Sequence, residues 1–110
     1  MIVRHTQSGP DTHGLTVGRE YTVIGIEADD YRLLNDLGEP ALFPSDAFAV
    51  IDPSRPADWI ASIGPDGEQY AYPAPLNSPG FFENFFDHEP AAVAAFWQDV
   101  NRRLNLATAG

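Results

Sequence analysis

Short runs of strand-forming residues, with turns only a few residues long between most of them, leave few folds open to the first half of this chain. The runs are Met1–His5, Arg19–Glu27, Tyr31–Asn35, Glu39–Phe43 and Phe48–Asp52. Glycine, proline and aspartate stand between them and favour tight turns over helices. Five short runs without intervening helices predict an antiparallel barrel or sandwich, in preference to a parallel sheet.

Individual residues within these runs predict further detail. The alternation of apolar residues in Arg19–Glu27 changes phase beside Gly25, which predicts a bulge or a sharp bend. Pro40 cannot donate a backbone hydrogen bond, so the run that contains it should begin at a sheet edge. The segment Pro44–Ala47 predicts a single helical turn before the fifth strand.

The second half of the chain begins with a predicted β-hairpin over residues 57–74. Its strands, Trp59–Ile63 and Glu68–Tyr72, flank an Asp66-Gly67 pair that suits a tight turn, because this pair tolerates positive φ. A short helix should follow, with Ser78 as its N-cap. We expect most of its four phenylalanines to pack against the next helix, and one or two to remain exposed: Phe81, Phe82, Phe85 and Phe86.

The last predicted element is a helix from Pro90 to about Leu104. Its apolar residues recur at helical spacing, and Asp99 can pair with Arg102 or Arg103 one turn later. A chain of 110 residues can bury one core. We therefore expect a single α+β domain over residues 1–110, with a small barrel at 1–52, the hairpin at 57–74 and a helical segment at 78–105 packed on it.

The charge balance limits the partners of this chain. Sixteen acidic residues and six basic ones, all arginines, give a formal net charge of −10. Such a chain repels phosphate backbones and anionic membranes, so neither nucleic acid nor a membrane is the expected partner. A cationic protein is the complementary choice, since opposite fields raise association rates. The alternative is that the acidity only aids solubility.

Composition also bears on location and on metal binding. The chain has no cysteine, which excludes disulfides and thiolate metal sites. The first residues have no apolar stretch of the kind a signal peptide needs, and no run approaches the roughly 20 apolar residues of a membrane span. We expect a cytoplasmic location.

Residues 14–51 carry a pattern that resembles small bacterial and phage proteins with an SH3-like barrel, some of them similar to immunity proteins of toxin systems. The shared residues are Leu15, Thr16, Gly18, Tyr21, Val23, Asp36, Gly38, Glu39, Phe43, Pro44 and Phe48. The resemblance implies an SH3-like antiparallel β-barrel for the first half. It also implies an accessory or immunity-type role. The second half is similar to immunity proteins in its size, acidity and aromatic-acidic segment.

We find no catalytic constellation and no motif for a cofactor. His5 and His13 flank a loop, but their spacing does not suit a metal site, and surface positions are expected for them. The sequence Asp87-His88-Glu89 precedes a helix, where acidic residues are expected for capping. Asp29-Asp30 lacks the regularly spaced oxygen ligands of a calcium loop and predicts a turn. The chain is therefore expected to be neither an enzyme nor a metalloprotein.

The leading hypothesis is a protein-binding domain, most specifically an immunity-type inhibitor of a cationic toxin or effector. Its expected contacts come from an acidic group in the first half and an aromatic-acidic group in the second: Asp29, Asp30, Asp36, Glu39, Phe82, Glu83, Phe86 and Asp87.

Two alternatives remain open. A nucleic-acid- or ribosome-associated barrel would need a basic stripe, for which only Arg4, Arg19 and Arg32 are candidates. A peptide-binding module could line a groove with tyrosines, although core positions with their hydroxyls at the rim are the more natural places for them: Tyr21, Tyr31, Tyr70 and Tyr72. The sequence does not indicate the oligomeric state.

Overall fold

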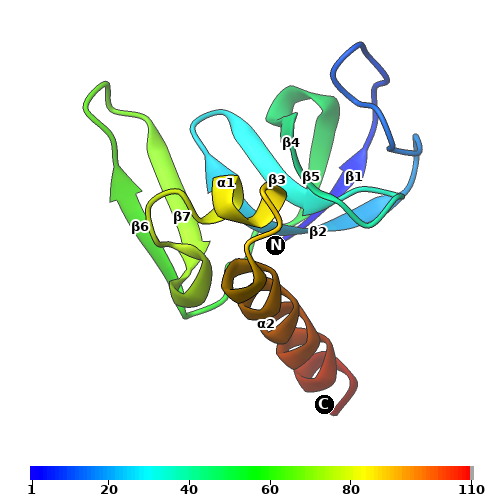
Figure 1. The fold of residues 1–110 in the computed structure, drawn as a ribbon. Coiled ribbons are helices and arrows are strands. Elements are labelled where there is room, and N and C mark those ends of the chain that lie inside the picture. Colours follow the sequence, from blue (N-terminus) through cyan, green and yellow to red (C-terminus); the bar gives the residue numbers. More distant parts are fainter. Residues whose placement is uncertain (110) are drawn as a thin grey trace. The chain divides into compact units, whose positions relative to one another are not determined.

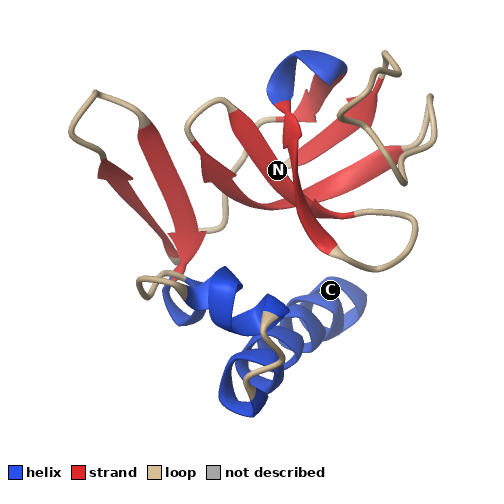
Figure 2. Cartoon of the chain, turned by 45° about the horizontal axis from the view of Figure 1, so that its top comes forward, coloured by secondary structure: helices blue, strands red, loops and turns tan. Residues whose placement is uncertain are grey.

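The computed structural model describes the backbone of residues 1–109 and the side chains as far as Arg103. It is an α+β structure with a seven-stranded open sheet followed by helices (Figures 1 and 2). The chain divides into two compact units, Met1–Pro73 and the part from Ala74 onward. The first unit contains every strand, and the second contains the two α-helices.

The first unit is built from antiparallel strand pairs. Strands β4, β3, β2, β1 and β5 are neighbours in that order, and β7 joins β2 on one side and β6 on the other. The strands are β1 (Ile2–His5), β2 (Glu20–Glu27), β3 (Asp30–Leu34), β4 (Pro40–Pro44), β5 (Phe48–Asp52), β6 (Trp59–Ile63) and β7 (Gln69–Pro73). All seven strands and the hairpin were predicted, to within a few residues at each end. The predicted turn at Asp29-Asp30 lies one residue earlier, because Ala28 adopts a positive φ and Asp30 begins β3.

The five-strand part of the sheet is curled but not closed. Its end strands β4 and β5 are joined only by a three-residue 3₁₀ turn, η1 (Ser45–Ala47), so the chain must fold back from one end of the sheet to the other. No hydrogen-bonded pairing joins β4 to β5 in the described residues. The helical turn and the antiparallel pairing are therefore confirmed, whereas the sheet is not closed and the expected SH3-like barrel over residues 1–52 is not confirmed. Pro40 begins the edge strand β4, as predicted.

The bulge expected beside Gly25 is present, and it brings a tyrosine against the backbone. The β2–β3 register shifts between Val23 and Gly25. Gly25 is buried, and a Cβ there would fall within 2.7 Å of Tyr72 Cζ and closer still to two other ring atoms. The absence of a side chain at Gly25 therefore lets β7 lay the Tyr72 ring against β2.

Two polar side chains are buried in the first unit, one of which, His5, was expected at the surface. The Arg32 side chain is buried, and its Nε donates to Tyr72 Oη at 2.8 Å while its Nη1 donates to the Pro40 carbonyl at 2.7 Å. His5 is 1% exposed, and its Nδ1 donates to the Ala47 carbonyl at 3.1 Å. Both residues lie on strands, where every second side chain points into the core, and the sequence pattern did not assign them to that face.

The second unit consists of η2 (Ala74–Leu76), α1 (Phe81–Phe86) and α2 (Pro90–Ala109), with both shorter elements in contact with α2. The prediction that Ser78 caps α1 through its side chain is wrong. The N-cap is Gly80 in a left-handed conformation, and Phe81 N–H donates to the Ser78 backbone carbonyl. Helix α2 extends beyond the predicted end, and the side chain of Leu104 lies outside the described residues.

Aromatic packing organises this second unit. Phe96 is fully buried, and its ring lies 4.9 Å from Phe85 and 6.1 Å from Phe82, centroid to centroid. The predicted ion pairs on α2 are present, since Asp99 accepts from Arg102 at 3.0 Å and from Arg103 at 2.8 Å. Asp99 itself is buried.

Candidate functional site

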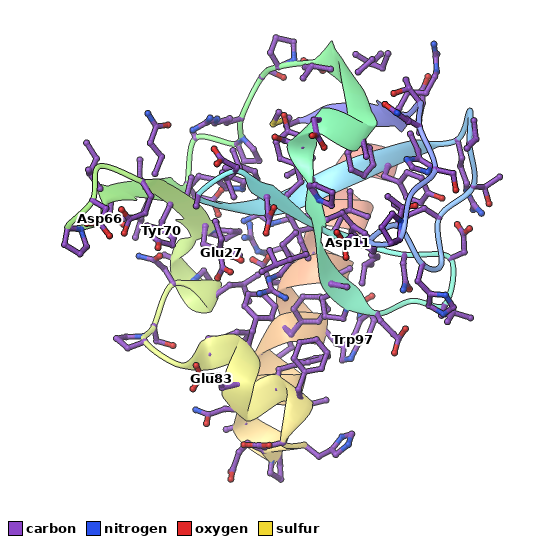
Figure 3. All side chains as sticks on the ribbon, turned by 90° about the horizontal axis from the view of Figure 1, so that it is seen from above. Asp11, Glu27, Asp66, Tyr70, Glu83 and Trp97 are labelled. Carbon is purple, nitrogen blue, oxygen red and sulfur yellow. The ribbon has the colours of Figure 1, made fainter. Side chains whose placement is uncertain are left out.

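Carboxylates gather where two turns of the first unit meet. Strand β2 pairs with β7, so that Glu27 lies opposite Tyr70 and the turn after β2 lies beside the turn before β7. Together the two turns line a shallow pocket of about 470 Å³, to which Asp29, Asp66 and Glu68 contribute. In Figure 3 the labelled Asp66, Tyr70 and Glu27 follow one another from the hairpin tip toward the body of the sheet.

The first unit contains a second acidic pocket. It has a volume of about 270 Å³ and is lined by the loop from Gln7 to Thr12 and by residues of η1. Asp11 and Asp46 are its carboxylates. The loop is shaped by Thr12, whose hydroxyl donates to the Gly9 carbonyl at 3.0 Å and accepts from the Gly9 N–H at 2.9 Å.

Asp30 connects the two pockets electrostatically. Its pKa is raised above the ordinary value, first by burial and then by the negative charges of Asp29, Glu27, Asp11 and Asp46. The last two belong to the second pocket and the first two to the turn at the first pocket. Repulsion from four nearby carboxylates disfavours the charged form of Asp30.

We call this surface the acidic face. Its members come from four separate segments of the first unit: Asp11, Glu27, Asp29, Asp30, Asp46, Asp66 and Glu68. Tyr70 lies at its side, and the pKa of its hydroxyl is raised by burial and then by Glu68, Glu27 and Asp66. The buried guanidinium of Arg32 lies 3.4 Å from the Glu27 carboxylate.

The acidic face presents dispersed negative charge. Among the described residues, no three histidine or acidic side chains converge closely enough to hold a metal ion. The carboxylates are instead spread over two open, shallow pockets, which suits the dispersed positive charge of a protein surface.

Two of the predicted contact residues, Asp36 and Glu39, lie elsewhere. They follow the far end of β3, whereas Asp30 begins it, and a five-residue strand spans roughly 17 Å. Asp36 accepts hydrogen bonds from Thr16 at 2.7 Å, Tyr21 at 2.8 Å and Arg19 at 2.9 Å. These bonds, together with the Arg19 charge, lower the pKa of Asp36. Its carboxylate therefore organises a loop.

Glu39 also takes part in a local turn. Asn35 Nδ2 donates to Glu39 Oε1 at 3.2 Å, and Asn35 Oδ1 accepts from the Glu39 N–H at 3.0 Å and from the Leu37 N–H at 3.0 Å. The structure therefore assigns both Asp36 and Glu39 to the β3–β4 connection and not to the acidic face.

The remaining predicted contacts belong to the second unit. Phe82 is 8% exposed and packs edge-on to Phe81 and Phe96, so its ring serves the interior. Phe86 is 48% exposed and continues a series of ring contacts through Phe85 and Phe96 to the partly exposed Trp97. Glu83 and Asp87 are exposed beside it, and Figure 3 labels Glu83 on α1 and Trp97 on α2.

The residues required by the nucleic-acid alternative do not form a basic stripe. Arg4 pairs with Glu20 at 2.8 Å, Arg19 pairs with Asp36 at 2.9 Å, and Arg32 is buried. Because a carboxylate accompanies each exposed guanidinium of this set, little positive potential remains to attract phosphates.

The tyrosines of the peptide-groove alternative are mostly structural. Tyr21 and Tyr72 are buried, with hydroxyls bonded to Asp36 and Arg32 respectively, while Tyr31 packs against Phe48. Burial is also the main cause that raises the pKa of Tyr72. The hydroxyl of Tyr70 lies near the acidic face, and that of Tyr72 lies near one of its members, Glu27.

Sequence reasoning missed five members of the acidic face: Asp11, Glu27, Asp46, Asp66 and Glu68. Each stands in or beside a turn, but only the β2–β7 pairing and the return of the chain through η1 bring these turns together.

Comparisons with protein-family models, with curated protein sequences and with solved structures found no match. No helix among the described residues is both long and apolar enough to cross a membrane.

Proposed function

We propose that this chain is a non-catalytic protein-binding domain whose partner is a cationic protein held at the acidic face. The observation that carries the proposal is the grouping of seven carboxylates from four segments around two shallow pockets. A folded domain of net charge −10 attracts a basic partner from a distance, and a local concentration of carboxylates orients it.

The specific form of the proposal is an immunity-type inhibitor that blocks the functional site of a cationic toxin or effector. The small size, the acidity and the absence of a recognisable catalytic motif support this role. The arrangement of the first five strands supports an SH3-like barrel as its framework. The sheet is curled, a helical turn lies between β4 and β5, and β5 returns to pair with β1.

The test begins with a partner isolated by affinity capture on the full chain from its native host. Its association rate with the wild-type chain is measured by stopped flow over a range of salt concentrations. We expect a basic partner, and a rate that falls at least about tenfold between low and physiological ionic strength, because salt screens long-range attraction. An association rate that ignores salt would contradict the proposal, as would turnover of a substrate by the purified chain.

Two charge-matched variants then locate the binding surface. The pair Asp29→Asn and Asp66→Asn removes two charges from the acidic face, and the pair Glu83→Gln and Asp87→Asn removes two from the second unit. We expect the first pair to slow association several-fold more than the second. Equal effects would mean that net charge alone matters, and the acidic face would lose its assigned role.

A further inference from the structure

Strand β6 has an open edge, and none of its own five residues carries the usual protective features. Within the described residues β6 pairs with β7 alone, and Figure 1 shows it on the outer side of β7. Its five residues, Trp59 to Ile63, contain no charge and no proline, and their register with β7 runs without a shift. Natural proteins usually guard an open edge with a charge, a proline or a bulge.

The other two open edges of the sheet do carry such features. Strand β4 has proline at both ends, Pro40 and Pro44. Strand β5 ends at Asp52 followed by Pro53, and its register with β1 shifts between Ile2 and Val3. The edge of β6 is thus the place where an added strand meets the fewest obstacles.

The backbone of β6 presents unused hydrogen-bonding groups to this edge. The Gly64 N–H donates to the Glu68 carbonyl, which fixes which residues of the hairpin exchange hydrogen bonds. In an antiparallel pair such residues alternate, so Ser62 and Ile60 bond to β7 while Ala61 and Ile63 direct their N–H and C=O groups outward. An incoming strand would complete these bonds.

The side chains of β6 suit an apolar partner strand. Ile63 is 74% exposed and Ile60 is 45% exposed, and they lie on opposite faces of the strand. Trp59 packs partly against the core and shares a face with Ile63. An added strand with alternating apolar residues would cover exposed apolar surface on both faces of the hairpin.

Charge decides which kind of strand fits. Beyond Ile63 the hairpin turns through Asp66 and Glu68, which line the larger pocket of the acidic face together with Asp29. A second copy of this chain would bring another net charge of −10 against the first, which opposes pairing. A strand that ends in lysine or arginine would instead place its positive charge beside Asp66 and Glu68 of this turn.

We propose that the β6 edge binds an extended, apolar segment of the cationic partner as an additional strand, with a basic residue of that segment beside Asp66 and Glu68. This inference rests on the proposed function, since it assumes the same cationic partner. It adds the mode of recognition: main-chain hydrogen bonds to Ala61 and Ile63 for affinity, and the acidic pocket for register.

The probe is a synthetic peptide in which valine alternates with threonine and lysine occupies both ends; its matched control has glutamate in place of lysine. Binding to the full chain is followed by NMR hydrogen exchange and by calorimetry. We expect the amide protons of Ala61 and Ile63 to gain protection with the lysine peptide and not with the glutamate peptide. Absence of binding, or protection elsewhere, would overturn the inference.

Variants then separate the edge from the acidic face. Ala61→Pro removes an outward N–H without removing a hydrogen bond to β7, and Ile63→Lys adds a repelling charge at an exposed position. Each should weaken the lysine peptide about tenfold, the equivalent of one lost hydrogen bond of ~1.4 kcal/mol. The control Val50→Lys, which adds the same charge on the exposed surface of β5, should change affinity less than about twofold.

The possible results distinguish this inference from the proposed function. Suppose that the natural partner binds with strong salt dependence, and that its affinity falls with Asp29→Asn but not with Ala61→Pro or Ile63→Lys. The proposed role of the acidic face is then supported, and strand addition at the β6 edge is refuted. If the chain alone forms dimers that Ala61→Pro abolishes, the occupant is a second copy, and the proposed partner strand is overturned.

Discussion

Replacing Gly25 with alanine should disrupt the packing between β2 and β7. The new Cβ would overlap the ring of Tyr72, which is 5% exposed and cannot move outward without breaking its bond to Arg32. Overpacking a core position costs about 1–3 kcal/mol. A weakened hydrogen bond to a buried guanidinium adds about 1.5–3 kcal/mol. We therefore expect Gly25→Ala to lower the free energy of unfolding by about 3–5 kcal/mol.

The measurement is urea unfolding followed by fluorescence and far-UV circular dichroism. A small domain has a total stability of about 5–15 kcal/mol, so a loss of this size moves the midpoint by a large fraction of its value. Gly9→Ala is the matched control. A Cβ at Gly9 meets nothing within 4 Å, so the same substitution should leave stability within about 1 kcal/mol of the wild type.

A double-mutant cycle tests whether the Tyr72 ring is the cause. In a Tyr72→Ala background the ring is absent, and Gly25→Ala should then cost less than about 1 kcal/mol. If Gly25→Ala leaves the wild-type chain within about 0.5 kcal/mol of its original stability, the close approach of β2 and β7 at this point is refuted. If the cost persists without the ring, the strain has another origin.

Two further predictions follow from polar groups in unfavourable surroundings. Asp30→Asn should raise the free energy of unfolding at pH 7 by a few tenths of a kcal/mol. Because the folded state raises the pKa of Asp30, the wild-type chain binds that proton more tightly when folded, and the stability difference between variant and wild type should vanish as pH falls through this pKa. Urea unfolding between pH 3 and 7 measures this difference. A gain in stability that persists in acid would contradict the prediction. His5→Phe should keep the ring contact with Phe48 and remove the imidazole Nε2, which is buried without a hydrogen-bond partner. It should change stability by less than about 1 kcal/mol, whereas His5→Ala should cost about 2–4 kcal/mol in the same assay. Similar losses for both would show that the Nδ1 hydrogen bond to Ala47, which both variants lack, matters more than the ring packing.

The order of elements could be predicted from the sequence because the evidence for it is local. Short β-branched runs, the Asp66-Gly67 turn and the helical spacing of Val93, Phe96 and Val100 each report on a few neighbouring residues. The bulge beside Gly25 was predictable for the same reason. Closure of the sheet was not, since it depends on whether β4 and β5 approach closely enough to pair.

The candidate site could be predicted only in part, because it is assembled by contacts between distant segments. Asp29 and Asp30 were named from a single acidic turn, but their neighbours Asp66 and Glu68 arrive through the pairing of β2 with β7. Asp36 looked equivalent in the sequence, yet three donors hold its carboxylate in a loop. Charge alone does not distinguish a carboxylate that is already bonded from one that is not.

Asp36 and Asp30 differ in the direction in which their surroundings shift the pKa. Around Asp36, a threonine, an arginine and a tyrosine lower the pKa, as expected where a carboxylate stabilises the fold. Around Asp30, burial and then four carboxylates raise it, which opposes folding at neutral pH. Asp36 has three hydrogen-bond donors, whereas Asp30, one strand length away, lies among like charges. The repulsion around Asp30 lowers the stability of the fold, and a cationic partner would relieve it. Local conflict of this kind is expected where function, and not stability, determines the residues.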